Sequence, residues 1–233
     1  MRVSIMQPYL FPYLGYFHLM EASDVIVLYD DVNYLKAGWV NRNRLLLHGE
    51  EFLFTVPVSK GSQNKRINEI RPVIDDRWRQ KFENRLYHAY RKSPNFEAIS
   101  QITKRTFAEE YQDITDMCLM SLKQVYEYLG IDFVWTKASS FAPETRGIGK
   151  ADRLIQIVKK YEAQQYVNVT GGQELYSKKY FQEHGIDLYF VKSFFREYKQ
   201  RGDRFVPGLS IIDLLMFNDK EQVKSYFKDF ELV

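Results

Sequence analysis

Residues 2–31 read RVSIMQPYLFPYLGYFHLMEASDVIVLYDD, and their pattern predicts the class of fold. Residues 2–6 are a short apolar segment that Pro8 ends, and residues 16–22 have the composition of a short helix. Residues 25–29 are apolar without a polar face, which is typical of a central strand that is covered on both sides. A strand, a loop, a helix and a second strand in this order form a βαβ unit, so the chain opens as an α/β protein.

The same alternation returns in the second half of the chain. We predict strands at 133–135, 165–169 and 186–191, and helices at 150–161, 173–184, 209–217 and 220–230. Residues 75–129 instead have the i, i+4 periodicity of helices, and Gly130 is a typical helix-end residue. We therefore predict a single α/β domain, residues 1–233. Its sheet is Rossmann-like and mostly parallel, with a helical lobe inserted at about residues 75–130.

The composition excludes several classes of protein. The chain has 33 Lys and Arg residues against 30 Asp and Glu residues, so it lacks the basic excess of a dedicated nucleic-acid binder. The one cysteine, Cys118, lies in an apolar run, so we expect a core thiol and a reducing compartment. The proline-containing N-terminus does not resemble a signal peptide, and no stretch approaches the about 20 apolar residues of a membrane span. We therefore expect a cytoplasmic protein that binds no nucleic acid.

The first candidate site is the loop QPYLFPYLGY at 7–16, between the first strand and the first helix. Such a loop presents free backbone N–H groups and is a natural anion site. Its Pro and Gly pattern distantly resembles the loop of nucleotidylyltransferases and class I synthetases, in which a His binds phosphate. Tyr16 stands in place of that His, which argues against their phosphate-transfer chemistry. We count Gln7, Tyr9, Tyr13 and Tyr16 as candidate substrate-binding residues, and a rigid loop that only packs the sheet edge is the alternative.

The second candidate is YDDVNYLKAGWVNRNR at 29–44, which follows the predicted central strand. Ligands of open α/β sheets bind at the carboxyl ends of strands. Adjacent carboxylates there can hold a metal or act as a base, basic side chains can clamp a phosphate, and aromatic rings can stack on a base or sugar. The candidate catalytic residues are Asp30, Asp31 and Lys36, and the candidate substrate-binding residues are Asn33, Trp39, Asn41 and Arg42. A salt-bridged surface loop is the alternative.

The third candidate is NVTGGQELY at 168–176, where a Gly pair between a strand and a helix lets the backbone approach a ligand. Further candidate substrate-binding residues are Asn168, Gly171 and Gly172, with Ser139 from the end of another strand. A basic loop at 60–65 could close over a phosphate, although plain surface is the more common role of such a loop. Neither GxGxxG nor GxxxxGK[ST] occurs, so dinucleotide and P-loop binding are not supported. The sequence indicates no metal site and leaves the cofactor open.

Five blocks together resemble the WbqC-like family of bacterial proteins. They are MQPYLFPYLGYF at 6–17, YDDVNYLKAGWVNRNRLL at 29–46, INEI at 67–70, YVNVTGGQELY at 166–176 and LSIIDLLMFN at 209–218. The blocks span nearly the whole chain in order. Members of this family are encoded among genes for O-antigen and other surface polysaccharides, and glycine transfer to an amino sugar has been proposed for them. The resemblance supplies no agreed set of catalytic residues.

This resemblance implies a transferase of surface-polysaccharide biosynthesis, which moves an acyl or aminoacyl (glycine) group to a nucleotide-linked amino sugar. Asp30 or Asp31 would be the base. Arg42, Lys36 and the backbone amides of 171–172 would bind the diphosphate or the developing oxyanion. Two alternatives stay open. One is a nucleotidyltransferase-like enzyme that binds a nucleoside triphosphate, and the other is a non-catalytic partner that binds a sugar nucleotide.

Overall fold

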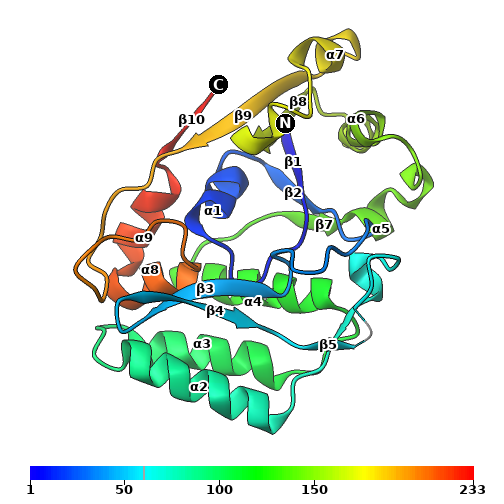
Figure 1. The fold of residues 1–233 in the computed structure, drawn as a ribbon. Helices are drawn as coiled ribbons and strands as arrows, with labels where there is room; N and C mark the ends of the chain where they lie inside the picture. Colours follow the sequence, from blue (N-terminus) through cyan, green and yellow to red (C-terminus); the bar gives the residue numbers. More distant parts are fainter. Residues whose placement is uncertain (60) are drawn as a thin grey trace.

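A six-stranded sheet forms the centre of the molecule, as a computed structural model of residues 1–59 and 61–233 shows (Figure 1). The strands lie in the order β10-β9-β8-β1-β2-β7. Their bounds are β1 (Arg2–Met6), β2 (Val25–Leu28), β7 (Trp135–Lys137), β8 (Gln165–Val169), β9 (Asp187–Ser193) and β10 (Phe230–Leu232). Neighbouring strands pair in parallel except for β10, which is antiparallel to β9. The predicted Rossmann-like, mostly parallel sheet is therefore confirmed. Lys60, the first residue of the predicted loop at 60–65, lies outside the described residues.

The order of the strands creates a topological switch point between β1 and β8. From β1 the chain adds β2 and then β7 on one side, and it returns to the other side of β1 to add β8 and β9. Connections that leave the carboxyl ends of β1 and β8 therefore run to opposite faces of the sheet. In open α/β sheets, the crevice at such a point is where ligands bind.

The two faces of the sheet are covered by different helices. Alternate side chains of β2 point to opposite faces, so Ile26 joins one hydrophobic cluster while Val25 and Val27 join the other. One face packs against α1 (Leu14–Glu21), α4 (Ile114–Leu129) and α9 (Lys220–Phe227). The other packs against α5 (Ala138–Phe141), α6 (Lys150–Lys160) and α7 (Lys178–Glu183). All four residues of β2 are buried, as expected for a central strand.

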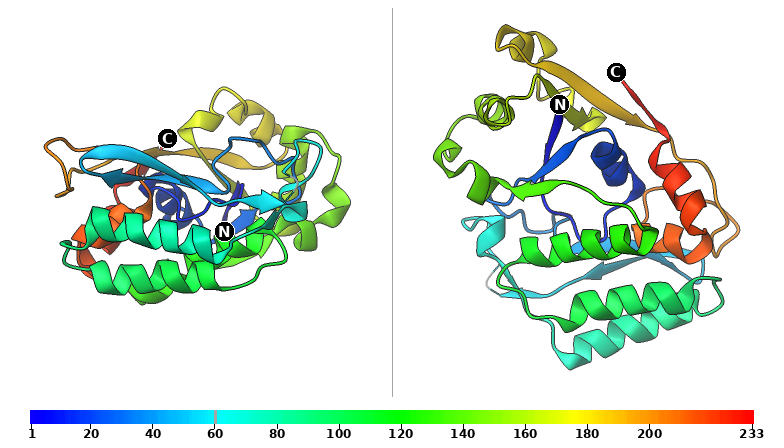
Figure 2. Two further views of the ribbon diagram at one scale, coloured as in Figure 1. Left: turned by 60° about the horizontal axis from the view of Figure 1, so that its bottom comes forward. Right: turned by 180° about the vertical axis from the view of Figure 1, so that it is seen from behind.

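The predicted helical region contains α2 (Asp76–Tyr90), α3 (Phe96–Ala108) and α4. These helices lie beside a hairpin of β3 (Arg42–Leu47) and β4 (Glu50–Thr55), away from α6 and α7 (Figures 1 and 2). The hairpin turns at His48 and Gly49, whose φ angles of 56° and 84° suit a tight turn of two residues. The smaller elements are β5 (Val58–Ser59), β6 (Arg71–Pro72), α8 (Ile211–Phe217) and the 3-10 turns η1 (Ile67–Glu69), η2 (Pro143–Thr145) and η3 (Thr170–Gly172).

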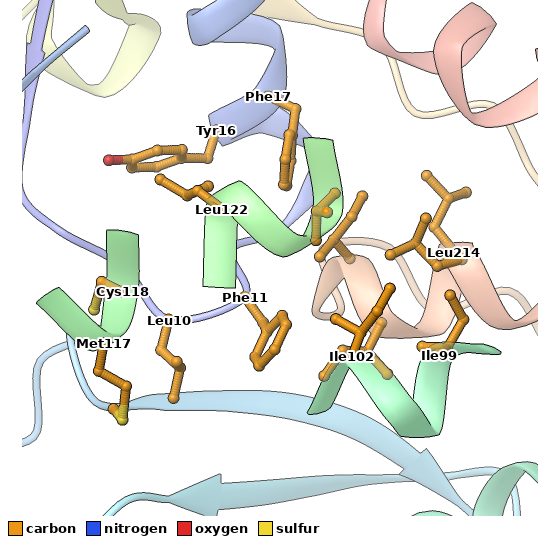
Figure 3. Packing of buried hydrophobic residues seen from close by; sticks show 14 of the residues in the cluster. Leu10, Phe11, Tyr16, Phe17, Ile99, Ile102, Met117, Cys118, Leu122 and Leu214 are labelled. Carbon is orange, nitrogen blue, oxygen red and sulfur yellow. The ribbon is translucent and has the colours of Figure 1, made fainter. Parts of the chain in front are cut away.

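The lobe and one face of the sheet share a single hydrophobic cluster. Phe11 from the β1–α1 loop and Phe17 of α1 belong to the same cluster as Ile102 of α3 and Leu122 of α4 (Figure 3). Cys118 is fully buried in this cluster, which confirms the expected core thiol. Because the contacts are continuous, burial of apolar surface stabilises the lobe and the sheet together. The description of residues 1–233 as one domain stays a prediction.

Two predicted helices are shorter in the structure than in the prediction. The helix predicted at 173–184 is shorter, because residues 170–172 form η3 and α7 begins only after Ser177, whose hydroxyl caps it by accepting from the Tyr180 N–H. Serine is a strong N-cap residue, whereas the backbone at the Gly pair is already engaged in its own turn. The helix predicted at 220–230 stops at Phe227, and Phe230–Leu232 form the edge strand β10, which the sequence pattern did not indicate.

A buried carboxylate, Asp213 of α8, links this helix to α2 and to the connection between β9 and α8. The Tyr90 and Tyr198 hydroxyls donate to its two oxygens at 2.8 and 2.7 Å. No basic side chain pairs with Asp213 in the described part of the chain. Burial raises the pKa of Asp213 above its ordinary value, although the tyrosine hydrogen bonds oppose the shift.

Asp213→Asn is expected to change how stability depends on pH. Because the pKa of Asp213 is raised in the folded chain, its carboxyl contributes most stability below the ordinary value of 3.8. That contribution is lost as the pH rises through the raised pKa. The unfolding free energy of the variant, relative to the native chain, should therefore increase as the pH rises from about 4 through the raised pKa. Urea titrations across this range test it, with the exposed Asp203→Asn as control, and a pH-independent difference would contradict the expectation.

Candidate functional site

A pocket of about 230 Å³ opens at the switch point between β1 and β8. Three segments form it: the end of β1 with the β1–α1 loop, the loop before β3, and the end of β8. The lining residues are Met6, Gln7, Pro8, Tyr9, Tyr13, Tyr16, Leu35, Gly38, Trp39, Val40 and Val169. The volume is below the about 300–1,000 Å³ of sites that enclose a drug-sized ligand. The pocket therefore suits one ring of a larger ligand.

The β1–α1 loop is fixed by an unusual backbone conformation at Phe11. Its φ angle of 41° lies in the left-handed region, which is unfavourable for a bulky side chain. The Phe11 N–H donates to the Ser121 hydroxyl at 3.1 Å. Its carbonyl accepts from the Asn43 amide at 2.6 Å and from the Ser210 hydroxyl at 2.8 Å. Side chains from α4, β3 and the start of α8 thus hold the loop and fix the pocket tyrosines on either side of Phe11.

The wall of the pocket is aromatic. The ring of Tyr9 lies 6.2 Å, centroid to centroid, from each of Tyr13, Tyr16 and Trp39. The Tyr9 hydroxyl donates to the Asn43 side-chain oxygen at 3.3 Å, which orients its ring. Burial raises the pKa of Tyr9, Tyr13 and Tyr16, so these phenols keep their protons at neutral pH. The pocket therefore offers flat apolar faces with neutral hydroxyl groups.

The side chain of Tyr16, which stands where the similar loops have a phosphate-binding His, is almost fully buried. It is 3% exposed, and its hydroxyl donates to the Gln7 carbonyl at 3.1 Å. This contact ties α1 to the end of β1. Tyr16 thus contributes its ring to the pocket wall.

Two arginines of β3 lie at the edge of the pocket, over the indole of Trp39. The guanidinium carbons of Arg42 and Arg44 are 4.9 and 5.6 Å from the ring centroid. Residues two apart on a strand project from the same side, which brings both cations to one ring. Arg44 is paired with Glu51 at 2.7 Å, whereas Arg42 has no acidic partner within the described residues. The edge of the pocket therefore carries a positive charge that no carboxylate balances.

Asp31 is engaged by a buried arginine. Nη2 of Arg153 lies 2.7 Å from both carboxylate oxygens, and Nε of Arg146 lies 3.4 Å from one of them. Asp31 and Arg153 are only 3% and 4% exposed. The guanidinium also lies 4.7 Å from the ring centroid of Tyr29. This ion pair fastens the end of β2 to α6.

Asp30 holds the start of α5. The Ser139 N–H donates to one carboxylate oxygen at 2.9 Å, and the Ser139 hydroxyl donates to the other at 2.5 Å. The Asn68 amide donates to Asp30 at 3.4 Å. Asp30 is fully buried, whereas Ser139 is partly exposed. Neither Asp30 nor Asp31 is among the residues that line the pocket.

The other predicted residues divide into two groups. Lys36 and Asn33 are exposed on the loop before β3. Asn41 is buried, where it accepts from the Tyr34 hydroxyl at 2.9 Å and donates to the Val56 carbonyl at 2.7 Å. Lys36 thus remains free to meet a ligand, whereas Asn41 serves the packing of the hairpin.

The Gly pair lies at the end of β8, next to the pocket residue Val169. The buried Asn168 side chain accepts from the Val169 N–H at 2.8 Å. A Cβ atom at Gly172 would come within 2.8 Å of the Asn168 amide nitrogen, whereas nothing lies within 4 Å of a Cβ at Gly171. A side chain at Gly172 would therefore displace the Asn168 amide, and Gly171 leaves its backbone accessible beside the pocket.

The structure brings one set of predicted residues together and reveals others. Gln7, Tyr9, Tyr13, Tyr16 and Trp39 line the pocket, and Arg42 lies at its edge. The lining residues that the sequence pattern did not indicate are Met6, Pro8, Leu35, Gly38, Val40 and Val169. Asn43 was also not singled out as a site residue. The alternation of NRNR at 41–44 is a strand pattern that separates inward asparagines from outward arginines, and this was the available signal.

The described residues contain no helix that is both long and apolar enough to cross a membrane. They also contain no group of three or more His, Cys, Asp or Glu residues arranged to hold a metal ion.

The fold and the pocket define an α/β protein with a doubly wound, mostly parallel sheet and a ligand-type crevice at its switch point. The chain belongs to the WbqC-like protein family, whose model matches residues 7–225. It is 30% identical over 233 residues to a protein of Mycobacterium tuberculosis (strain ATCC 25618 / H37Rv) that is named "Uncharacterized protein Rv1507c", with 97% of each chain covered. No solved structure matches the chain.

Proposed function

We propose that the chain is a transferase of surface-polysaccharide (O-antigen) biosynthesis that binds a nucleotide-linked amino sugar in the switch-point pocket. It transfers an acyl or aminoacyl group, such as glycine, to the amine of that sugar. The observation that carries the binding half of the proposal is the aromatic pocket between β1 and β8, with an unbalanced arginine at its edge. The nature of the transferred group follows from the resemblance to the WbqC-like family.

The pocket suits one ring of such a ligand. Tyr9, Tyr13 and Trp39 offer flat faces on which a nucleobase can stack, and the neutral hydroxyls of the two tyrosines can reach its polar edge. Gln7 adds an amide to the same lining. Because the pocket holds only one ring, the remainder of the ligand extends along the carboxyl edge of the sheet.

The transfer joins the amine nitrogen to the acyl carbon, and the leaving group departs with its electron pair. A base must take the proton that the amine loses, and donors must stabilise the oxyanion that forms. We propose Asp30 as this base, acting through the partly exposed hydroxyl of Ser139, because both oxygens of Asp31 are bound by Arg153. Lys36 and the backbone of Gly171 are the proposed oxyanion donors, since both are exposed.

Thermal unfolding against a ligand panel tests the binding half of the proposal. The panel contains nucleotide-linked amino sugars, ATP and CTP with Mg²⁺, glycine, and acyl-CoA. A ligand at about a hundred times its Kd adds about 2.7 kcal/mol, which raises Tm by about 5–10 °C in a chain of this size. A shift with an amino-sugar nucleotide supports the proposal, and mass spectrometry of the reaction with a donor then detects the acylated sugar. A shift only with a triphosphate contradicts it and supports a nucleotidyltransferase. Binding of the amino-sugar nucleotide without turnover with any donor supports a non-catalytic partner.

Trp39→Ala is expected to weaken binding of the amino-sugar nucleotide by about tenfold or more, because stacking on an aromatic side chain contributes about 1–3 kcal/mol per base. Titration calorimetry measures the change. Tyr87→Ala is the matched control, since Tyr87 is 46% exposed, compared with 44% for Trp39, and also has an arginine over its ring. Tyr87 lies on α2, outside the pocket. Equal affinities of the two variants would contradict the role of Trp39.

A further inference from the structure

Arg42 is the least satisfied cation at the pocket. Its Nε atom is buried and has no hydrogen-bond partner among the described residues. No carboxylate lies within 4.0 Å of its guanidinium in the same part of the structure. A partly buried guanidinium without an anion is unfavourable, because it has lost water without gaining a partner. Such a group is ready to accept an anionic ligand.

Arg44 adds a second positive charge to the same place. Its guanidinium lies over the same Trp39 ring, and its Nε is likewise buried without a partner. Its remaining nitrogens are held by Glu51 at 2.7 Å and by the Gly208 carbonyl at 3.1 Å, so this side chain is fixed in position. Two guanidinium groups with one carboxylate leave a net positive charge. Guanidinium groups bind phosphate oxygens with two parallel hydrogen bonds, so a dianionic phosphate group suits this position better than a single carboxylate.

The charge also lies close to the pocket itself. Burial raises the pKa of Tyr9, and the positive charges of Arg44 and Arg42 oppose that rise. Because the interaction between charges weakens with distance, this opposition indicates that both guanidinium groups are near the Tyr9 hydroxyl. Trp39 lines the pocket on one side and carries both arginines on its ring. One molecule can therefore place a ring in the pocket and an anionic group on the arginines.

We propose that Arg42, supported by Arg44, binds the diphosphate of the ligand, so that the nucleoside diphosphate is the class of molecule that the site recognises. This assignment rests on the proposed function, because it places the nucleobase in the aromatic pocket. Nucleoside diphosphates occur both in sugar nucleotides and in coenzyme A. Both kinds of molecule contain a nucleobase ring followed by two phosphates. The identity of the preferred base distinguishes a sugar nucleotide from coenzyme A.

Titration calorimetry with UDP, dTDP, GDP, ADP and coenzyme A, and with uridine, thymidine, guanosine and adenosine, tests the proposal on the full chain. The diphosphate that binds best should bind at least tenfold more tightly than its own nucleoside. Arg42→Gln should weaken that diphosphate about 10–100-fold and the nucleoside less than threefold. Arg71→Gln is the control for the loss of one positive charge, because Arg71 is an exposed arginine of β6 that lies outside this pocket. Binding of the diphosphate should also weaken with added salt.

The outcomes separate this assignment from the proposed function. If a nucleoside and its diphosphate bind equally and Arg42→Gln changes neither, the phosphate assignment is overturned while the pocket still binds the base. If no nucleoside, diphosphate or amino-sugar nucleotide binds, the proposed function fails together with it. Selective binding of ADP and coenzyme A supports the diphosphate site but assigns it to the donor, and selective binding of UDP, dTDP or GDP assigns it to the acceptor.

Discussion

Arg153→Met is expected to destabilise the protein by about 3–5 kcal/mol, because it leaves the carboxylate of Asp31 buried without a cation. Nη2 of Arg153 lies 2.7 Å from both oxygens of that carboxylate. Both residues are almost fully buried, so water cannot replace the lost partner. The loss should also loosen the junction between β2 and α6 at the edge of the sheet where we place the site.

Urea denaturation of three variants checks this expectation. Arg146→Met should cost less than about 1 kcal/mol, because Arg146 is more exposed and its Nε lies 3.4 Å from Asp31. The double variant Arg153→Met with Asp31→Asn should recover part of the loss, since no buried charge then remains. A loss below about 1 kcal/mol in Arg153→Met would contradict the view that Asp31 is held by this ion pair.

Asn43→Ala is expected to cost about 1–3 kcal/mol and to weaken ligand binding as well. The fully buried amide of Asn43 donates to the carbonyls of Leu10 and Phe11 at 3.2 and 2.6 Å. The Leu10 carbonyl then lacks this donor, which costs about 1–3 kcal/mol, whereas the Phe11 carbonyl keeps the hydrogen bond from the Ser210 hydroxyl. The left-handed conformation of Phe11 also loses one of the contacts that maintain it. The ring of Tyr9, which hydrogen-bonds to Asn43, then loses its fixed position in the pocket wall.

The two effects of Asn43→Ala are measured separately. Urea denaturation gives the loss of stability, and titration calorimetry at a temperature where the variant is folded gives the loss of affinity. Asn33→Ala is the control for stability, because Asn33 is exposed, and it should change the unfolding free energy by less than about 0.5 kcal/mol. If Asn43→Ala is destabilised but binds the ligand as tightly as the native chain, the proposed link between the loop conformation and the pocket is wrong.

Local sequence patterns were sufficient to predict most elements of the fold. The apolar run at 25–29 indicated a central strand, and β2 is buried throughout. The helical periodicity of 75–129 corresponds to α2, α3 and α4. These features are visible in sequence because each depends on side chains within one or two turns of each other. The edge strand β10 was not predicted, since its pairing with β9 depends on residues distant in the chain.

The candidate site was predicted in its segments but not in the contacts of each residue. The clusters at 7–16 and 29–44 do meet at the switch point, because both follow strands that end at the same edge. The partner of Asp31 is 122 residues away in the chain, and the strand order that brings β8 beside β1 is equally remote. The two adjacent aspartates in the sequence therefore did not indicate that Asp30 accepts from Ser139 or that Asp31 pairs with Arg153. Asn43 was missed because its role depends on the strained backbone at Phe11.

We place the ligand of this WbqC-like protein in the crevice between β1 and β8. A crystal structure of the protein with the tightest-binding nucleotide-linked amino sugar tests this placement most directly. We expect a nucleobase against Tyr9 and Trp39, with the diphosphate within hydrogen-bonding distance of Arg42. Ligand density at the larger cavity of about 460 Å³ in the lobe, which Arg71, Arg79 and Tyr111 help to line, with an empty switch-point pocket, would contradict it.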